Sequence, residues 1–311
     1  MAVLGLDTSN YTPSAAVFDG ETGFSETRLL DVRPGELGLR QSDALFQHGK
    51  HLPELFRRLA EHGALTALQA VGASTRPREV EGSYMPCFLA GMSQAQGLAD
   101  TLGVPFFAHS HQQGHLAAAA WSAGRLDLLD RPFLAWHLSG GTTELLRAEP
   151  MGCSVRAEII GGTSDISAGQ LIDRTGVLLG LQFPAGKALD ALYGQGEKSL
   201  RFRVKQNELT FSLSGMENKV KQLAQQGETP ADIARFTLDT VTDIVCRTTE
   251  EAQRRWPGLP VLCSGGVASN RRLREVMSQR CQAIFAQPKF STDNAMGTAI
   301  LTWRKWKESQ S

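Results

Sequence analysis

Residues 133–147 read Phe-Leu-Ala-Trp-His-Leu-Ser-Gly-Gly-Thr-Thr-Glu-Leu-Leu-Arg, and this stretch decides the fold class. The apolar run 133–138 predicts a buried strand, Ser139-Gly140-Gly141 predicts a tight turn, and 143–147 predicts a second strand. A similar order occurs near the N-terminus, where the apolar run 3–6 leads into Asp7-Thr8-Ser9 and then into an apolar segment at 14–18. Two halves that begin alike indicate an internal duplication of one architecture.

Strands and helices follow each of these starts. In the first half we expect a helix at 52–61, a strand at 70–74, a helix at about 85–102, a strand at 104–108 and, after Ser110 as N-cap, a helix to about 123. In the second half we expect helices near 167–179, 186–193, 214–226 and 230–255, a strand at 260–263, a glycine turn at 264–266, a helix at 268–279 and a terminal helix from Asp293. Segment 20–50 is polar and yields no assignment. This order predicts two α/β domains with a ligand cleft between them.

The composition is typical of a globular protein. A chain of 311 residues with 41% hydrophobic residues fits two globular domains, and 32 basic against 32 acidic side chains neither require nor exclude a nucleic-acid partner. No apolar run approaches the roughly 20 residues that span a bilayer, so we expect no membrane partner. We see no secretion signal, and the five cysteines are scattered. Reduced thiols in the cytoplasm are the expectation.

Two histidines are candidate metal ligands. His111 and His115 are four residues apart, so on a helix both imidazoles lie on one face, and imidazole suits zinc or iron. The other interpretation is a pair of surface histidines, because an isolated His-x-x-x-His is a weak motif. Asp7 and Asp293 each lie at the edge of an apolar segment, where a carboxylate serves as an N-cap or as a ligand.

Two glycine turns are candidate phosphate sites. Ser139-Gly140-Gly141-Thr142 and Ser264-Gly265-Gly266 each follow a strand, where small residues let backbone N–H groups approach a phosphate. Neither is a Walker motif, and a Gly-Gly turn alone is often only a turn. Asp173 is a candidate to bind ribose hydroxyls, or it is a solvated helix charge.

Taken together and in this order, these segments resemble the TsaD-like family, once called glycoproteases or O-sialoglycoprotein endopeptidases. The resemblance covers nearly the whole chain and depends on the following segments: 3–9, Gly82-Ser83, Gly91, 104–105, His111 to His115, 138–142, Asp165 to Asp173, 179–186, 211–215, 264–274 and 291–294. It implies the two-domain actin-like ATPase fold, with duplicated ribonuclease H-like domains at 1–125 plus 290–311 and at 126–289.

The family's residue roles are carried over where this sequence matches. The resemblance implies that His111, His115 and Asp293 bind one divalent metal, iron or zinc. It implies that Ser139, Gly140, Gly141 and Thr142 form the phosphate loop, and that the nucleoside of ATP or threonylcarbamoyl adenylate is held by Asp173, Gly186 and Asn270. Asp7 is a candidate general base or water organiser. The implied partners are tRNA and the family's TsaB-like and TsaE-like companions, or a second copy in a homodimer.

The chain also departs from the family pattern, which indicates a diverged member. The segment 10–12 replaces an acidic pair, Arg76-Pro77-Arg78 replaces Gly-Pro-Gly, Ile166 replaces an Asp, and Gln170 replaces a Glu. Segment 214–218, with Glu217, replaces Ser-Gly-Leu-Lys-Thr. The metal and nucleotide residues are kept, while their surroundings are altered.

The leading hypothesis is a transferase that moves a threonylcarbamoyl group from its adenylate to the exocyclic amine of the tRNA adenosine beside the anticodon. One alternative is a carbamoyltransferase-like enzyme with a non-tRNA substrate, which would fit the altered loops. Another is a non-catalytic ATP-binding scaffold. Protease activity is not expected, because His111-x-x-x-His115 lacks the Glu of the His-Glu-x-x-His motif.

Overall fold

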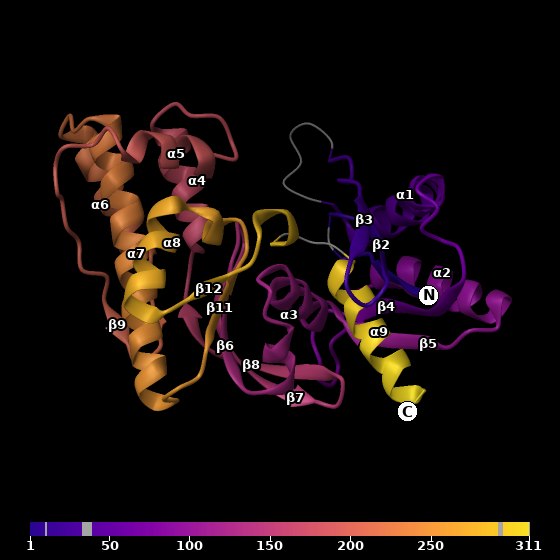
Figure 1. The fold of residues 1–311 in the computed structure, drawn as a ribbon. Coiled ribbons are helices and arrows are strands. Elements are labelled where there is room, and N and C mark those ends of the chain that lie inside the picture. Colours follow the sequence, from indigo (N-terminus) through magenta and orange to yellow (C-terminus); the bar gives the residue numbers. More distant parts are fainter. Residues whose placement is uncertain (10, 33–38, 292–294, 311) are drawn as a thin grey trace. The chain divides into compact units, whose positions relative to one another are not determined.

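The structure, a computed structural model, describes residues 1–9, 11–32, 39–291 and 295–310 (Figure 1). Contacts within the chain divide it into two compact units. The first contains Met1–Arg131, Glu149–Ala157 and Asp293–Ser311, and the second contains Pro132–Ala148 and Glu158–Thr292. No helix in the described ranges is long and apolar enough to cross a membrane.

The described residues of the first unit form a five-stranded sheet in the order β3-β2-β1-β4-β5. Its strands are β1 (Ala2–Asp7), β2 (Ser14–Phe18), β3 (Gly23–Thr27), β4 (Leu68–Arg76) and β5 (Phe106–Ser110). Strand β1 lies at the centre, antiparallel to β2 and parallel to β4. Five of its six residues are buried, as expected for a strand covered on both faces. The predicted strand–turn–strand start of this half is confirmed, whereas β3 was not predicted.

Helices pack on this sheet: α1 (Gln41–Glu61), α2 (Phe88–Leu102), α3 (His111–Ser122) and α9 (Met296–Ser309), with a short 3-10 helix at Leu126–Asp130. Helix α9, the yellow end of the chain, packs against α3, β1 and β4 (Figure 1). The prediction that α1 begins at residue 52 was wrong. Its buried stripe extends back through His51, His48 and Ala44, and the two histidines hide that stripe from a count of apolar residues.

The second unit has a seven-stranded sheet within its described residues, in the order β12-β11-β6-β7-β8-β10-β9. The strands are β6 (Phe133–Leu138), β7 (Thr143–Met151), β8 (Ser154–Thr163), β9 (Gln206–Asn207), β10 (Thr210–Phe211), β11 (Val261–Ser264) and β12 (Ile284–Phe285). Strands β6 and β7 form the antiparallel hairpin predicted from 133–147. Strands β8, β9, β10 and β12 were not predicted, and the tip of the β7–β8 hairpin is counted with the first unit.

Five helices are described in the second unit: α4 (Ala168–Leu178), α5 (Gly186–Tyr193), α6 (Ser214–Gln225), α7 (Pro230–Arg255) and α8 (Arg271–Cys281), with 3-10 turns at Val267–Ser269 and Pro288–Phe290. The first four match the predicted ranges closely. Helix α8 begins at Arg271 rather than at residue 268, because the side chain of Asn270 accepts a hydrogen bond from Leu273 N and so caps the helix there. The main core of this unit is built around Trp136 and Phe236.

Candidate functional site

Asp7 and His111 meet at one end of the first unit's sheet. Asp7 ends β1, and His111 is the first residue of α3, which follows β5. Ser110 caps α3 in a reciprocal capping box with Gln113, so the start of the helix is fixed. His111 Nδ1 lies 2.8 Å from Asp7 Oδ2.

The Asp7 carboxylate is buried, with 1% of its surface exposed. Burial by itself would raise its pKa, but the charge and hydrogen bond of His111, with hydrogen bonds from Ser74 and Ser9, hold the pKa below its ordinary value. Asp7 is therefore an ionised carboxylate inside the protein.

His115 lies beside His111, as the four-residue spacing predicts. The ring centroids are 4.2 Å apart with an interplanar angle of 73°. Helix α9 crosses α3 at this point, and the two backbones are very close together there. A Cβ on Gly297 would lie 1.7 Å from Gly114 O. Glycine at position 297 allows the two backbones to approach so closely. The crossing places the start of α9 against the turn of α3 that carries both histidines.

The predicted third metal ligand, Asp293, lies outside the described residues. In the part of the chain that the structure describes, no three His, Cys, Asp or Glu side chains gather as a metal site. The two imidazoles fit a borderline metal such as zinc or iron in their donor chemistry, and they need at least one further ligand to complete a site.

The predicted phosphate loop is held in shape by its own hydrogen bonds. Ser139 Oγ accepts from Thr142 N at 3.0 Å, and Ser139 N donates to Thr142 O at 2.8 Å. The loop is also held against the start of α4, because Ser167 Oγ donates to Gly140 O at 2.6 Å. A Cβ on Gly169 would lie 2.4 Å from Ser139 O, so only glycine permits this contact.

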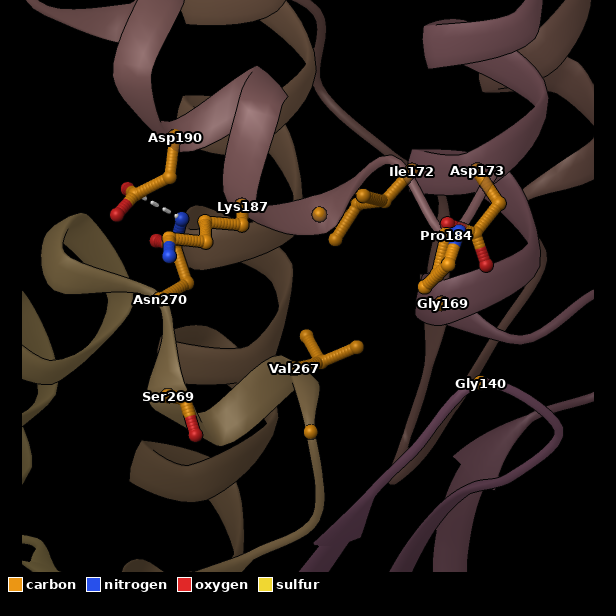
Figure 2. Close-up of a pocket in the computed structure, with 12 residues that line it drawn as sticks. Gly140, Gly169, Ile172, Asp173, Pro184, Lys187, Asp190, Val267, Ser269 and Asn270 are labelled. Carbon is orange, nitrogen blue, oxygen red and sulfur yellow. Dashed lines mark hydrogen bonds between the residues drawn. The ribbon is translucent and has the colours of Figure 1, made fainter. Parts of the chain in front are cut away.

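A pocket of about 400 Å³ lies beside this loop in the second unit (Figure 2). It is lined by four of the predicted nucleotide residues: Gly140, Asp173, Gly186 and Asn270. Ser139, Gly141 and Thr142 belong to the same loop as Gly140 but are not among the lining residues. Residues separated by up to 130 positions in the sequence therefore border one cavity.

The polar groups of the pocket are held in place by short hydrogen bonds. Asn270 Nδ2 donates to Asp190 Oδ1 at 2.7 Å, the dashed line in Figure 2. Asp173 Oδ1 accepts from Ala185 N at 2.8 Å, which fixes the loop before α5 against α4. Fixed carboxylates and an amide around an apolar cavity are suited to the hydroxyls and ring edge of a nucleoside.

Two charged residues that line the pocket, Asp190 and Lys187, were not predicted from the sequence. Both lie on α5, and Asp190 is four residues after Gly186, so the two share one helix face. That spacing from a predicted site residue is the signal that could have identified Asp190. Lys187 brings a cation to the same pocket, which Asp190 and Asn270 also line (Figure 2).

A second hollow of about 590 Å³ shares Gly140 and Asp173 with this pocket. It is bordered by Phe183, whose surface is 74% exposed. Arg174 and Lys221 border it and both pair with Glu217, at 2.6 and 2.7 Å.

Basic side chains at the start of α8 and towards the end of α9 make interactions within their own units. Arg271 pairs with Asp190, Arg272 pairs with Asp239, and the Arg274 guanidinium lies 4.7 Å from the ring centroid of Phe285. Arg304 pairs with Asp130, and Lys307 lies over Trp303 and Trp306.

Comparison with solved structures identifies the fold. The chain superimposes on full-length HypF with a TM-score of 0.64 at 13% identity, covering 99% of this chain and 56% of that one. It superimposes on component A of the Acidaminococcus fermentans (R)-2-hydroxyglutaryl-CoA dehydratase with a TM-score of 0.59 at 14% identity, covering 99% of both chains. These are actin-like ATPase folds, so the predicted fold class is confirmed.

Comparison of sequences identifies the family. The family model of TsaD, described as tRNA N6-adenosine threonylcarbamoyltransferase, matches residues 38–300. A Thermus thermophilus protein named tRNA N6-adenosine threonylcarbamoyltransferase is 33% identical, over 98% of this chain and 93% of that one. A Syntrophotalea carbinolica protein of the same name is 30% identical, over 88% and 87%. The chain that carries the capped histidine helix and the Gly140–Asn270 pocket belongs to the TsaD family.

Proposed function

We propose that this chain transfers a threonylcarbamoyl group from threonylcarbamoyl adenylate to the exocyclic amine of the tRNA adenosine beside the anticodon. The observation that carries the proposal is the pocket of the second unit. Four residues chosen as nucleotide ligands from the family pattern border one cavity, in a chain whose relatives are named for this reaction.

The proposed nucleotide contacts follow from the chemistry of the lining groups. The backbone N–H groups of Gly140 and Gly141 donate to the phosphate, since Ser139 N and Thr142 N make hydrogen bonds within the loop. A glycine turn at the end of a strand lets the ligand approach closely. Asp173 and Asp190 accept hydrogen bonds from the ribose hydroxyls, and Asn270 contributes its amide. ATP and threonylcarbamoyl adenylate share the adenosine and the first phosphate, so both fit this description.

The proposed metal ligands are His111, His115 and Asp293, with iron or zinc as the ion. A bound divalent metal would supply Lewis-acid polarisation of the acyl oxygen. Asp7 belongs to the proposed site because its carboxylate contacts His111. The two imidazoles at the start of a firmly capped helix are the structural support for the site.

The proposed reaction is an acyl substitution. The adenosine amine forms a bond to the carbamoyl carbon and loses a proton to water, the bond from that carbon to the phosphate oxygen breaks, and AMP leaves. Fixed groups in the pocket lower the entropic cost by holding the adenylate in one orientation.

The protein partners, the cellular location and the domain boundaries are also proposals. TsaB-like and TsaE-like companion proteins or a second copy of the chain are the proposed protein partners, and the cytoplasm is the proposed location. We propose the domain division at 1–125 plus 290–311 and 126–289, in which each domain contains one sheet.

The deciding experiment incubates the full chain with threonylcarbamoyl adenylate, Zn²⁺ or Fe²⁺, unmodified tRNA and the family's companion proteins. The expected result is threonylcarbamoyl adenosine, detected by mass spectrometry of digested tRNA and lost in His111→Ala. Intact adenylate binding without tRNA modification would contradict the proposal. It would then favour a non-tRNA acceptor if the adenylate is consumed, and a scaffold if it is not.

A further inference from the structure

The face of α4 that borders the second hollow is largely apolar and exposed to solvent. Arg174, Val177 and Leu178 are three and four positions apart, so they lie on one face of the helix. Val177 is 59% exposed and Leu178 is 46% exposed. Phe183, in the loop after this helix, adds an exposed aromatic ring to the same hollow. Apolar side chains that gather at one place on a surface indicate a binding site, whereas scattered ones do not.

The loop that carries Phe183 is bonded to α4 on both sides of the ring. Leu181 N donates to Gly176 O at 2.9 Å, and Ala185 N donates to Asp173 Oδ1 at 2.8 Å. These bonds hold the backbone two positions before and two positions after Phe183. A ligand that contacts the ring therefore does not have to order the loop, which lowers the entropic cost of binding.

Two cations border the second hollow and share one counter-ion. Arg174 Nη1 donates to Glu217 Oε2 at 2.6 Å, and Lys221 Nζ donates to Glu217 Oε1 at 2.7 Å. About half of each cationic side chain is exposed, so both can reach a ligand. The three side chains together carry one positive charge. A carboxylate that bridges two cations occupies the place that a phosphate group would take.

The second hollow adjoins the Gly140–Asn270 pocket, because Gly140 and Asp173 border both. Gly140 belongs to the proposed phosphate loop, and in threonylcarbamoyl adenylate the acyl carbon is attached to that phosphate. An attacking amine has to come within about 3–3.5 Å of the acyl carbon before the new bond forms. A group held in the second hollow lies beside the phosphate that carries this carbon.

We propose that the second hollow is the acceptor subsite, in which an unpaired base of the acceptor RNA stacks on Phe183 and the adjoining phosphate binds Arg174 and Lys221. This inference rests on the proposed function and assigns residues to its acceptor side. An aromatic ring beside cations suits unpaired nucleotides, because every base has a face that stacks and every phosphate is an anion. A protein partner fits less well, since stable protein interfaces bury about 1,200–2,000 Å² and three apolar side chains supply little of that area.

Glu217 competes with the RNA phosphate for the two cations. Glu217→Gln removes the negative charge and keeps the length of the side chain, so it frees Arg174 and Lys221 for the phosphate. We expect this variant to bind RNA about 2- to 10-fold more tightly at low salt. Damage to the fold would weaken binding, so a gain in affinity distinguishes the proposed contact from a structural effect.

The main test measures binding of a fluorescein-labelled, unmodified anticodon stem-loop RNA to the full chain by fluorescence anisotropy. Phe183→Ala should weaken binding about 5- to 100-fold, because one base loses its stacking partner, and Phe183→Trp should preserve it. The matched control is Phe46→Ala on α1 in the first unit, where the phenylalanine is 72% exposed. It should bind RNA as wild type does. All four variants should keep their ATP affinity, because Phe183, Glu217 and Phe46 do not line the Gly140–Asn270 pocket.

Four results would overturn the inference: no RNA binding by the wild type, wild-type affinity in Phe183→Ala, an equal loss in Phe46→Ala, or no gain in Glu217→Gln. RNA binding that depends on Phe183, without acyl transfer, would support the inference while refuting the proposed function. Transfer to tRNA by Phe183→Ala with an unchanged KM would overturn the inference and leave the proposed function standing.

Discussion

At the scale of single residues, Asn270 has two separable functions. Its Oδ1 caps α8 by accepting from Leu273 N, and its Nδ2 holds Asp190 in the pocket. Asn270→Ala should lower stability by about 1 kcal/mol, because the cap is lost. Asn270→Ser should keep the cap, since serine is a preferred N-cap, but it is too short to reach Asp190 as asparagine does.

Both Asn270 variants should bind ATP about 2- to 10-fold more weakly, because one hydrogen bond that orders the pocket is missing. Isothermal titration gives the affinity, and urea denaturation gives the stability. Wild-type affinity in both variants would show that Asn270 serves α8 alone.

At the scale of elements, the start of α6 depends on a residue 48 positions earlier in the chain. The N-cap residue of α6, Leu213, has no side-chain cap of its own. Asp165 instead accepts from Leu213 N at 2.8 Å, from Ser214 N at 3.2 Å and from Ser212 Oγ at 2.5 Å. Partial burial would raise the pKa of Asp165, but these donors lower it well below its ordinary value of 3.8.

The lowered pKa of Asp165 determines how the stability of the protein changes with pH. The folded state favours the ionised carboxylate, so its stabilisation is complete above the unfolded-state pKa and is lost as the pH falls below about 4. Asp165→Asn should cost about 1 kcal/mol at pH 7. The difference from wild type should shrink between pH 5 and pH 3, as followed by urea denaturation. A difference that stays constant over this range would refute the capping role.

At the scale of the whole molecule, the first unit is completed only by the last helix of the chain. Helix α9 packs on α3 and on β1, the first strand. The closest point is the crossing of Gly297 and Gly114, where a Cβ on Gly297 would overlap the Gly114 carbonyl. Gly297→Ala should therefore destabilise the protein by about 1–3 kcal/mol, although alanine favours helices.

The matched control is Gly49→Ala in α1, where a Cβ would have no neighbour within 4 Å. This change should raise stability by up to about 1 kcal/mol, because alanine replaces glycine inside a helix. The urea midpoint should thus fall for Gly297→Ala and rise for Gly49→Ala. An equal rise of the midpoint in both variants would show that helix propensity, and not the crossing, controls the effect at Gly297.

The sequence by itself determined the class of fold and most of its regular elements. The runs 133–138 and 143–147 form the β6–β7 hairpin, and helices α4 to α7 lie close to their predicted ranges. These segments have a clear pattern of apolar residues or a clear helix-capping residue, so their local sequence specifies them. Segments whose stability comes from pairing, such as β9, β10 and β12, are two residues long and carry no local signal. The same holds for the start of α1, where buried histidines take apolar positions.

Only the tertiary structure decided which polar residues act together. It brought Gly140, Asp173, Gly186 and Asn270 to one pocket and added Asp190 and Lys187. It also showed that two departures from the family pattern are near each other, since Gln170 borders the second hollow and Glu217 pairs with two cations that border it. Asp7 was recognisable in sequence only as a carboxylate after a strand. Its enclosure by Ser9, Ser74 and His111 depends on β1, β4 and α3 packing together, because hydrogen bonds across long sequence separations exist only once the chain has folded.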